Sequence, residues 1–114
     1  MSAGQMEGRA VLDRSKLEAA ARVLQAMAHP LRLGIVQALA GGEKTVTALY
    51  EELGCSQSTM SQQLRILETQ SLVQGRRDGA LKYYSLRNRD FLKLFDCMAA
   101  HLRQFFKIQG GDLT

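Results

Sequence analysis

The chain has 114 residues, of which 46% are hydrophobic and 23% charged, and its formal net charge at pH 7 is +4. This length predicts a single domain with a modest hydrophobic core, and the mildly basic balance is compatible with a polyanionic partner. No apolar run approaches the ~20 residues that span a bilayer, and the N-terminus lacks the charged and then apolar pattern of a secretion signal. We therefore expect a cytoplasmic protein in which the two cysteines form no disulfide framework.

Two helices are expected in the N-terminal third of the chain, after a polar and flexible arm at residues 1–13. The first begins near residue 15, and its apolar positions are Leu17, Ala20, Ala21, Leu24 and Met27. It should end before Pro30, which can open a second helix at residues 30–39 that Gly41 and Gly42 terminate. We expect His29 to form a hydrogen bond at the start of that second helix rather than to bind a ligand.

Two further helices are expected in close succession, at residues 45–54 and 56–69. Thr45 is a typical N-cap and Gly54 a typical C-cap, and only Cys55 separates Gly54 from Ser56, the next N-cap. Two helices joined by so tight a turn are typical of a helix-turn-helix.

The helix that follows Ser56 has two faces of different chemistry. Met60, Leu64 and Leu67 form an apolar stripe. The opposite face, which we call the polar row, consists of Gln57, Ser58, Ser61, Gln62 and Arg65. These residue types can pair with base edges in a major groove, whereas an ordinary solvated face is rich in Lys and Glu. We interpret the segment as a DNA recognition helix with Ser56 and Gln63 as further candidate contacts; the alternative is a polar surface helix without a ligand.

After residue 69 the hydrophobic period changes to two, which predicts a β-hairpin of residues 72–77 and 80–86 joined by Asp78 and Gly79. Tyr83 and Tyr84 supply cross-strand packing. The cationic residues near the tip are Arg76, Arg77 and Lys82. A cationic hairpin directly after a recognition helix is typical of a wing that contacts the phosphate backbone or the adjacent minor groove; a solvated hairpin tip is the alternative.

A long last helix is expected at about residues 88–109, before a flexible tail at residues 110–114. Its apolar stripe consists of Phe91, Leu94, Phe95, Met98, Leu102, Phe105 and Phe106. This is more apolar surface than a chain of this size needs to close its own core. We expect the last helix and the Ala-rich first helix to pack against their copies in a two-fold homodimer.

Several segments together resemble the ArsR/SmtB family of bacterial transcriptional repressors. They are residues 28–33 (Ala-His-Pro-Leu-Arg-Leu), residues 56–64, Leu72-Val73, Arg77-Asp78-Gly79 and residues 83–86 (Tyr-Tyr-Ser-Leu), in the family's order and spacing. The resemblance implies a winged helix-turn-helix, mainly α with about five helices and a two-stranded β-hairpin wing. It also implies a homodimer that binds a palindromic operator and releases it when an effector arrives.

The family's metal sites are incomplete in this sequence. Its Cys-Val-Cys thiolate core corresponds here to Thr45, Val46 and Thr47. The positions that match the zinc site of its last helix are Asn88, Asp90, His101 and Gln104. Only Asp90 and His101 are good zinc ligands, and a tight site needs three or four. We therefore predict no high-affinity metal site.

The two cysteines are the remaining candidates for sensing chemistry. Cys55 takes a position where the family usually has Val, Ile or Leu, so it is either a buried apolar side chain or, if exposed before a helix N-terminus, an oxidisable thiol. Cys97 lies one turn before His101, and the pair could hold a soft metal or activate the thiolate, or Cys97 is merely structural. Both interpretations stay open.

We expect a sequence-specific DNA-binding regulator, an effector-released repressor in the family's manner. The alternative is a winged-helix module that contacts another protein and has no specific DNA target. An enzyme is disfavoured because the chain has no Ser/His/Asp set, no carboxylates paired in an apolar setting and no phosphate-binding glycine loop. We expect neither catalysis nor a cofactor.

Overall fold

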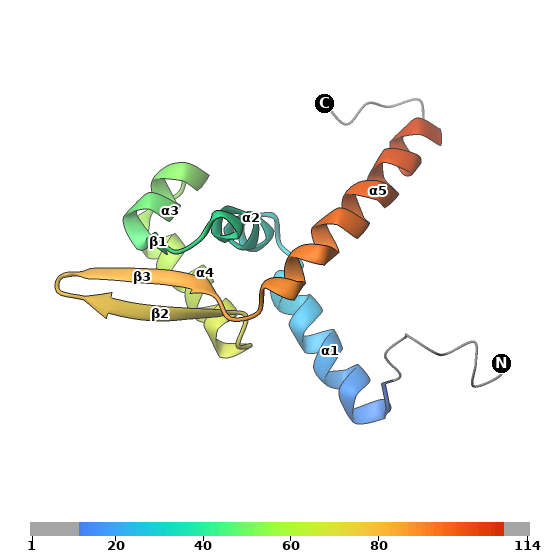
Figure 1. The fold of residues 1–114 in the computed structure, drawn as a ribbon, viewed down its shortest axis with the longest axis horizontal. Coiled ribbons are helices and arrows are strands. Elements are labelled where there is room, and N and C mark those ends of the chain that lie inside the picture. The colour runs from blue at the N-terminus through green and yellow to red at the C-terminus, as the bar shows by residue number, and fades with distance from the viewer. Residues whose placement is uncertain (1–11, 109–114) are drawn as a thin grey trace.

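The computed structural model of the protein describes residues 12–108, so the expected tail and nearly all of the expected arm lie outside the described residues. The helices are α1 (Arg14–Met27), α2 (Pro30–Ala38), α3 (Val46–Leu53), α4 (Gln57–Thr69) and α5 (Leu92–Ile108). The strands β1 (Lys44–Thr45), β2 (Val73–Asp78) and β3 (Leu81–Leu86) form an antiparallel sheet in the order β1-β3-β2. Figure 1 shows α2, α3 and α4 beside the sheet, while α1 and α5 diverge from this body.

Side-chain hydrogen bonds cap the N-terminal ends of α2, α3 and α4. The side chain of Thr45 accepts a hydrogen bond from the Ala48 amide at 3.1 Å and begins α3, and Ser56 does the same with the Thr59 amide at 3.1 Å to begin α4. His29 Nδ1 accepts from the Leu31 amide at 3.2 Å ahead of α2. The predicted caps of α3 and α4 and the predicted role of His29 are therefore confirmed.

The core lies between α2, α3, α4 and the sheet. Its fully buried large side chains are Ile35, Val36, Leu39, Leu49, Met60, Leu64, Leu67, Leu72 and Val73. From α1 only Ala26 and Met27 are buried, at its C-terminal end. Leu17 and Leu24, which the periodicity placed on an apolar face, are each 55% exposed in the single chain. Most of that predicted face therefore remains uncovered.

The sheet differs from the two-stranded hairpin that the sequence predicts, because β1 adds a third strand. Lys44 pairs with Tyr84 and Thr45 with Tyr83. A strand of two residues is too short to show a period of two, so its sequence carries no strand signal. The loop is also displaced by one residue: Asp78 pairs with Leu81, which leaves Gly79 and Ala80 between the strands. Gly79, at φ +63°, then takes the first loop position, where a type II′ turn requires glycine.

The ends of two helices are tighter than predicted. The second helix closes with a 3-10 turn, η2 (Leu39–Gly41), and the last helix opens with another, η3 (Arg89–Phe91), before α5 begins at Leu92. The side chain of Asn88 accepts a hydrogen bond from the Asp90 amide at 2.9 Å and starts this turn. Such 3-10 turns are common at helix ends.

Replacing the cap of α3 should destabilise the fold. We expect Thr45→Ala to lower the free energy of unfolding by about 1 kcal/mol, because the Ala48 amide loses its partner. Thr47→Ala, an exposed position inside α3, is the control and should cost nothing, since alanine favours helix. Urea denaturation followed by circular dichroism measures both; an equal loss in the two variants would contradict the capping role.

Candidate nucleic-acid interface

A helix-turn-helix is formed by α3, α4 and the three residues between them. Gly54 is left-handed, at φ +70°, and its amide donates to the Tyr50 carbonyl at 3.0 Å. The Cys55 amide donates to the same carbonyl at 3.1 Å. This turn reverses the chain directly into Ser56, the cap of α4, as the glycine and the spacing predicted.

The polar row lies on the outer face of α4. All five of its members, Gln57, Ser58, Ser61, Gln62 and Arg65, are exposed. Met60, Leu64 and Leu67 on the opposite face are fully buried and fasten the helix to the core. The exposed cap residue Ser56 leaves the N-terminal end of the helix open to solvent. The arrangement presents hydrogen-bonding side chains and a helix N-terminus on one accessible surface.

Gln63 stands apart from the other candidate contacts on α4. It is half-buried, and its Oε1 accepts a hydrogen bond from Nη1 of Arg32 at 2.7 Å. Arg32 lies on α2, 31 positions earlier, so no local pattern in the sequence could indicate this pair. The structure therefore does not bring Gln63 together with the polar row.

Arg76 on the hairpin is exposed and forms an ion pair with Glu43. Its Nη2 and Nε donate to the two carboxylate oxygens of Glu43 at 2.6 and 3.0 Å, and its guanidinium lies 4.7 Å from the ring centre of Tyr83. The hydrogen bonds from Arg76 lower the pKa of the Glu43 carboxyl. A lowered carboxyl pKa means that the pair is fully formed at neutral pH and is lost only as the pH falls through that pKa.

Arg77 and Lys82 face each other across the hairpin, because the register pairs them directly. The ammonium of Lys82 lies 5.1 Å from the ring centre of Tyr84. Gly75 leaves room for this: a Cβ there would come within 2.7 Å of Lys82 Cε. Arg77 is exposed and makes no ion pair within residues 12–108, so among the three predicted wing cations its charge is the most available.

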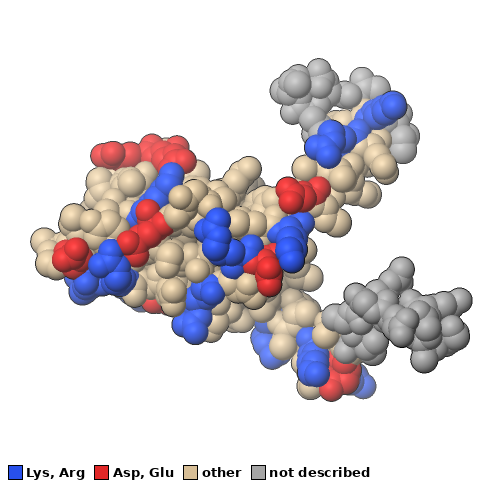
Figure 2. Space-filling model, in the orientation of Figure 1, with Lys and Arg blue, Asp and Glu red and all other residues tan. Residues whose placement is uncertain are grey.

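Acidic side chains lie both beside the wing cations and in a separate group on α3: Glu43 pairs with Arg76 at 2.6 Å, and Asp78 lies 3.9 Å from it. Figure 2 shows an acidic cluster over α3, whereas at the hairpin end basic and acidic side chains lie next to one another. The exposed carboxylates of α3 are Glu51 and Glu52, and Glu52 pairs with Lys44 at 2.6 Å.

The candidate sensing residues lie on different elements. Cys55 is half-buried against the core, and Cys97 is exposed on α5. Asp90 makes an exposed ion pair with Lys93 at 3.4 Å. In the part of the chain that the structure describes, no three His, Cys, Asp or Glu side chains come together as metal ligands would. The expectations for metal and for the thiols remain predictions.

Comparison with known proteins identifies the family. A family model described as a helix-turn-helix domain matches residues 27–76. The chain is 37% identical over 94 residues to the transcriptional repressor SmtB homolog of Synechocystis. The matched region covers 82% of this chain and 71% of that protein. The chain belongs to the ArsR/SmtB family of transcriptional regulators.

Other ArsR/SmtB-type proteins give the same result. NmtR, an HTH-type transcriptional regulator of Mycobacterium tuberculosis, is 41% identical over 80% of this chain and 79% of its own length. Rv0324 from the same organism is 38% identical, and this chain spans only 39% of it. A solved homodimeric winged helix-turn-helix DNA-binding domain, Mb0332 from Mycobacterium bovis, matches with a TM-score of 0.72 at 33% identity, over 87% of this chain and 95% of that one.

The family confirms two predictions made from the sequence, the winged helix-turn-helix fold and a regulator rather than an enzyme. Within residues 12–108, no helix combines the length and the apolar character needed to cross a membrane.

Freeing Arg76 should strengthen binding to duplex DNA of any sequence. We expect Glu43→Gln to raise affinity for random duplex DNA and to steepen its dependence on salt by up to about one phosphate contact, because the guanidinium loses its nearer carboxylate partner and keeps only Asp78, 3.9 Å away. Glu51→Gln is the control, since it removes the same charge from an exposed carboxylate without releasing an arginine. Fluorescence anisotropy across a salt series measures both, and identical slopes in the two variants would contradict the prediction.

Proposed function

We propose that this protein is a transcriptional repressor that binds a two-fold symmetric operator as a homodimer, with α4 in the major groove. The observation that carries the proposal is the polar row, exposed on a helix whose other face is wholly buried. Gln, Ser and Arg side chains in this arrangement can donate to and accept from base edges. The named repressors and DNA-binding domains among its relatives support the assignment. A DNA target implies a cytoplasmic location.

Contacts on either side of the polar row would set the register on DNA. Ser56 Oγ already accepts from the Thr59 amide, so it keeps the N-terminal turn of α4 in place while that turn approaches a phosphate. On the wing, Arg77 and then Lys82 are the main phosphate contacts. Arg76 contributes less than its position in the sequence suggests, because Glu43 neutralises it.

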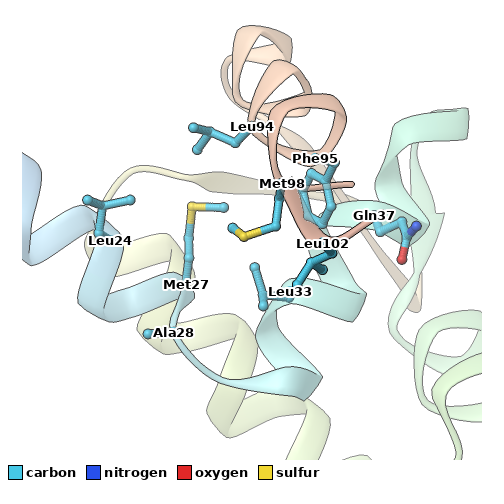
Figure 3. Close-up of a pocket in the computed structure, with 9 residues that line it drawn as sticks. All are labelled: Leu24, Met27, Ala28, Leu33, Gln37, Leu94, Phe95, Met98 and Leu102. Atoms are coloured by element: carbon cyan, nitrogen blue, oxygen red, sulfur yellow. The ribbon is translucent and has the colours of Figure 1, made fainter. Parts of the chain in front are cut away.

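The homodimer would form through α1 and α5. Met98 and Phe105 on α5 are 49% and 46% exposed, and Leu17 and Leu24 on α1 are more exposed still. An apolar groove of about 570 Å³ runs between α1, α2 and α5. Figure 3 shows Leu24 and Met27 of α1 pointing across it toward Leu94 and Met98 of α5. Apolar helix faces of this extent are ordinarily covered by a partner, and two-fold symmetry would then place the recognition helices about 34 to 36 Å apart.

The polar row and the wing should contribute differently to binding. We expect Gln62→Ala to reduce the preference for an operator over random duplex by about tenfold while leaving the salt slope unchanged. Arg77→Ala should weaken operator and random duplex alike and lower the slope by about 0.9, since one phosphate contact is lost.

Anisotropy titrations on both duplexes at several salt concentrations test these roles, with Gln74→Ala on the exposed part of β2 as the control. The reverse assignment of the two effects would contradict the roles. If the wild type bound both duplexes equally, the alternative of a protein-contact module would be favoured.

A charge on the apolar face of α5 should break the dimer. We expect Met98→Glu to give a folded monomer that binds the operator at least tenfold more weakly, because the carboxylate would be buried against the partner. Gln104→Glu, an exposed position about 120° around the same helix from Met98, is the control and should remain dimeric. Sedimentation velocity measures the association state, and a dimeric Met98→Glu variant would contradict the α1 and α5 interface.

A further inference from the structure

Arg32, near the start of α2, joins three helices through one guanidinium group. Its Nε donates to the carbonyl oxygen of Ala26 near the end of α1, and its Nη1 donates to Oε1 of Gln63 on α4 at 2.7 Å. Both hydrogen bonds are partly buried. The side chain therefore connects a helix of the proposed dimer interface with the proposed recognition helix.

The bond to Ala26 satisfies one of the carbonyls that the C-terminal end of α1 leaves without an intrahelical donor. A helical carbonyl normally accepts from the amide four residues later, which for Ala26 is Pro30, a residue without an N–H. The neighbouring carbonyls of Gln25 and Met27 accept from the amides of residues 28 and 29. Arg32 supplies the donor that Pro30 lacks, and a cation at a helix C-terminus also interacts favourably with the helix dipole.

The bond to Gln63 is special among the contacts of α4. Within residues 12–108 it is the only side-chain hydrogen bond that joins α4 to another element. The side chains of α4 that are fully buried in the core are apolar: Met60, Leu64 and Leu67. Apolar contacts resist separation but are not directional, whereas a hydrogen bond to a planar guanidinium depends on angle as well as distance.

We propose that Arg32 is a positioning residue for DNA recognition, and that Gln63 acts through Arg32 rather than by contacting DNA. This inference rests on the proposed docking of α4 in the major groove. The pair holds α4 at one rotation about its own axis, and because Gln62 is the next residue along the helix, any rotation that breaks the pair also displaces the polar row. Through Ala26 the same guanidinium sets this rotation relative to α1.

Two other roles make different predictions. If Arg32 contacted a phosphate, its removal would lower the salt slope by about 0.9. If Gln63 contacted a base, its substitution would act independently of Arg32, and the fold-changes of the two variants would multiply. The geometry disfavours both, because the side chains are half-buried and already engaged with each other.

The test is a double-mutant cycle of Arg32→Met and Gln63→Met, measured by anisotropy on a duplex selected by the wild-type protein from a random library and on random duplex. We expect each single variant to reduce preference for the selected duplex about tenfold, with unchanged salt slope, and the double variant to lose no more than either single one. Gln63→Glu should retain the preference, since a carboxylate still accepts from Arg32. Arg77→Met on the wing, outside α4, is the control, and its loss of affinity for the selected duplex should multiply with that of Arg32→Met.

Three results would each overturn the inference. The losses of Arg32→Met and Gln63→Met could multiply, or either variant could lower the salt slope. The third is a Gln63→Glu variant that is as impaired as Gln63→Met. Wild-type preference that Gln63→Met leaves intact would overturn it as well, while the proposed function would stand. If the wild type selected no sequence at all, the proposed function would fail and this inference with it. Thermal unfolding monitors folding, and because Gln63→Met keeps the Arg32 bond to Ala26, that variant keeps the test decisive if Arg32→Met unfolds.

Discussion

The burial of three side chains, Met60, Leu64 and Leu67, is the interaction on which the surface of this protein depends. All three are fully buried on one face of α4, and burying side chains of this size contributes roughly 1.5 to 3 kcal/mol each. Because the stripe fastens α4 to the core, the other face needs no residue for stability. It can carry Gln, Ser and Arg side chains that remain free to bond with something outside the chain.

How much the sequence predicts depends on how far apart the interacting residues are. The caps at Thr45 and Ser56 involve positions three residues apart, and the sequence alone predicts them. Arg76 and Glu43 are 33 positions apart, so a residue that the local pattern assigns to DNA is in fact paired within the fold. Strand β1 could not be predicted from the sequence, because two residues are too few to show the alternating hydrophobic pattern of a strand.

Periodicity also leaves open what covers an apolar stripe. It correctly predicts that α1 and α5 each carry one, but the same pattern arises whether the cover is the chain's own core or a second copy. In the structure only the end of α1 is buried, and Leu94, Met98, Leu102 and Phe105 of α5 stay exposed, so the chain's own core leaves much of both faces uncovered. These faces lie together around the groove between α1, α2 and α5, where Figure 3 shows both helices contributing side chains.

Arg32 satisfies a carbonyl at the junction where α1 ends and Pro30 begins α2. Pro30 is a favourable first residue for α2, yet it leaves the Ala26 carbonyl without its usual amide donor. A guanidinium can satisfy that carbonyl and still has further N–H groups to donate, which a lysine or glutamine side chain cannot direct in the same planar geometry. In this chain a further N–H reaches Gln63. The junction between two helices thereby becomes a link to a third, so that the end of the proposed dimer helix and the rotation of the proposed recognition helix are governed by one side chain.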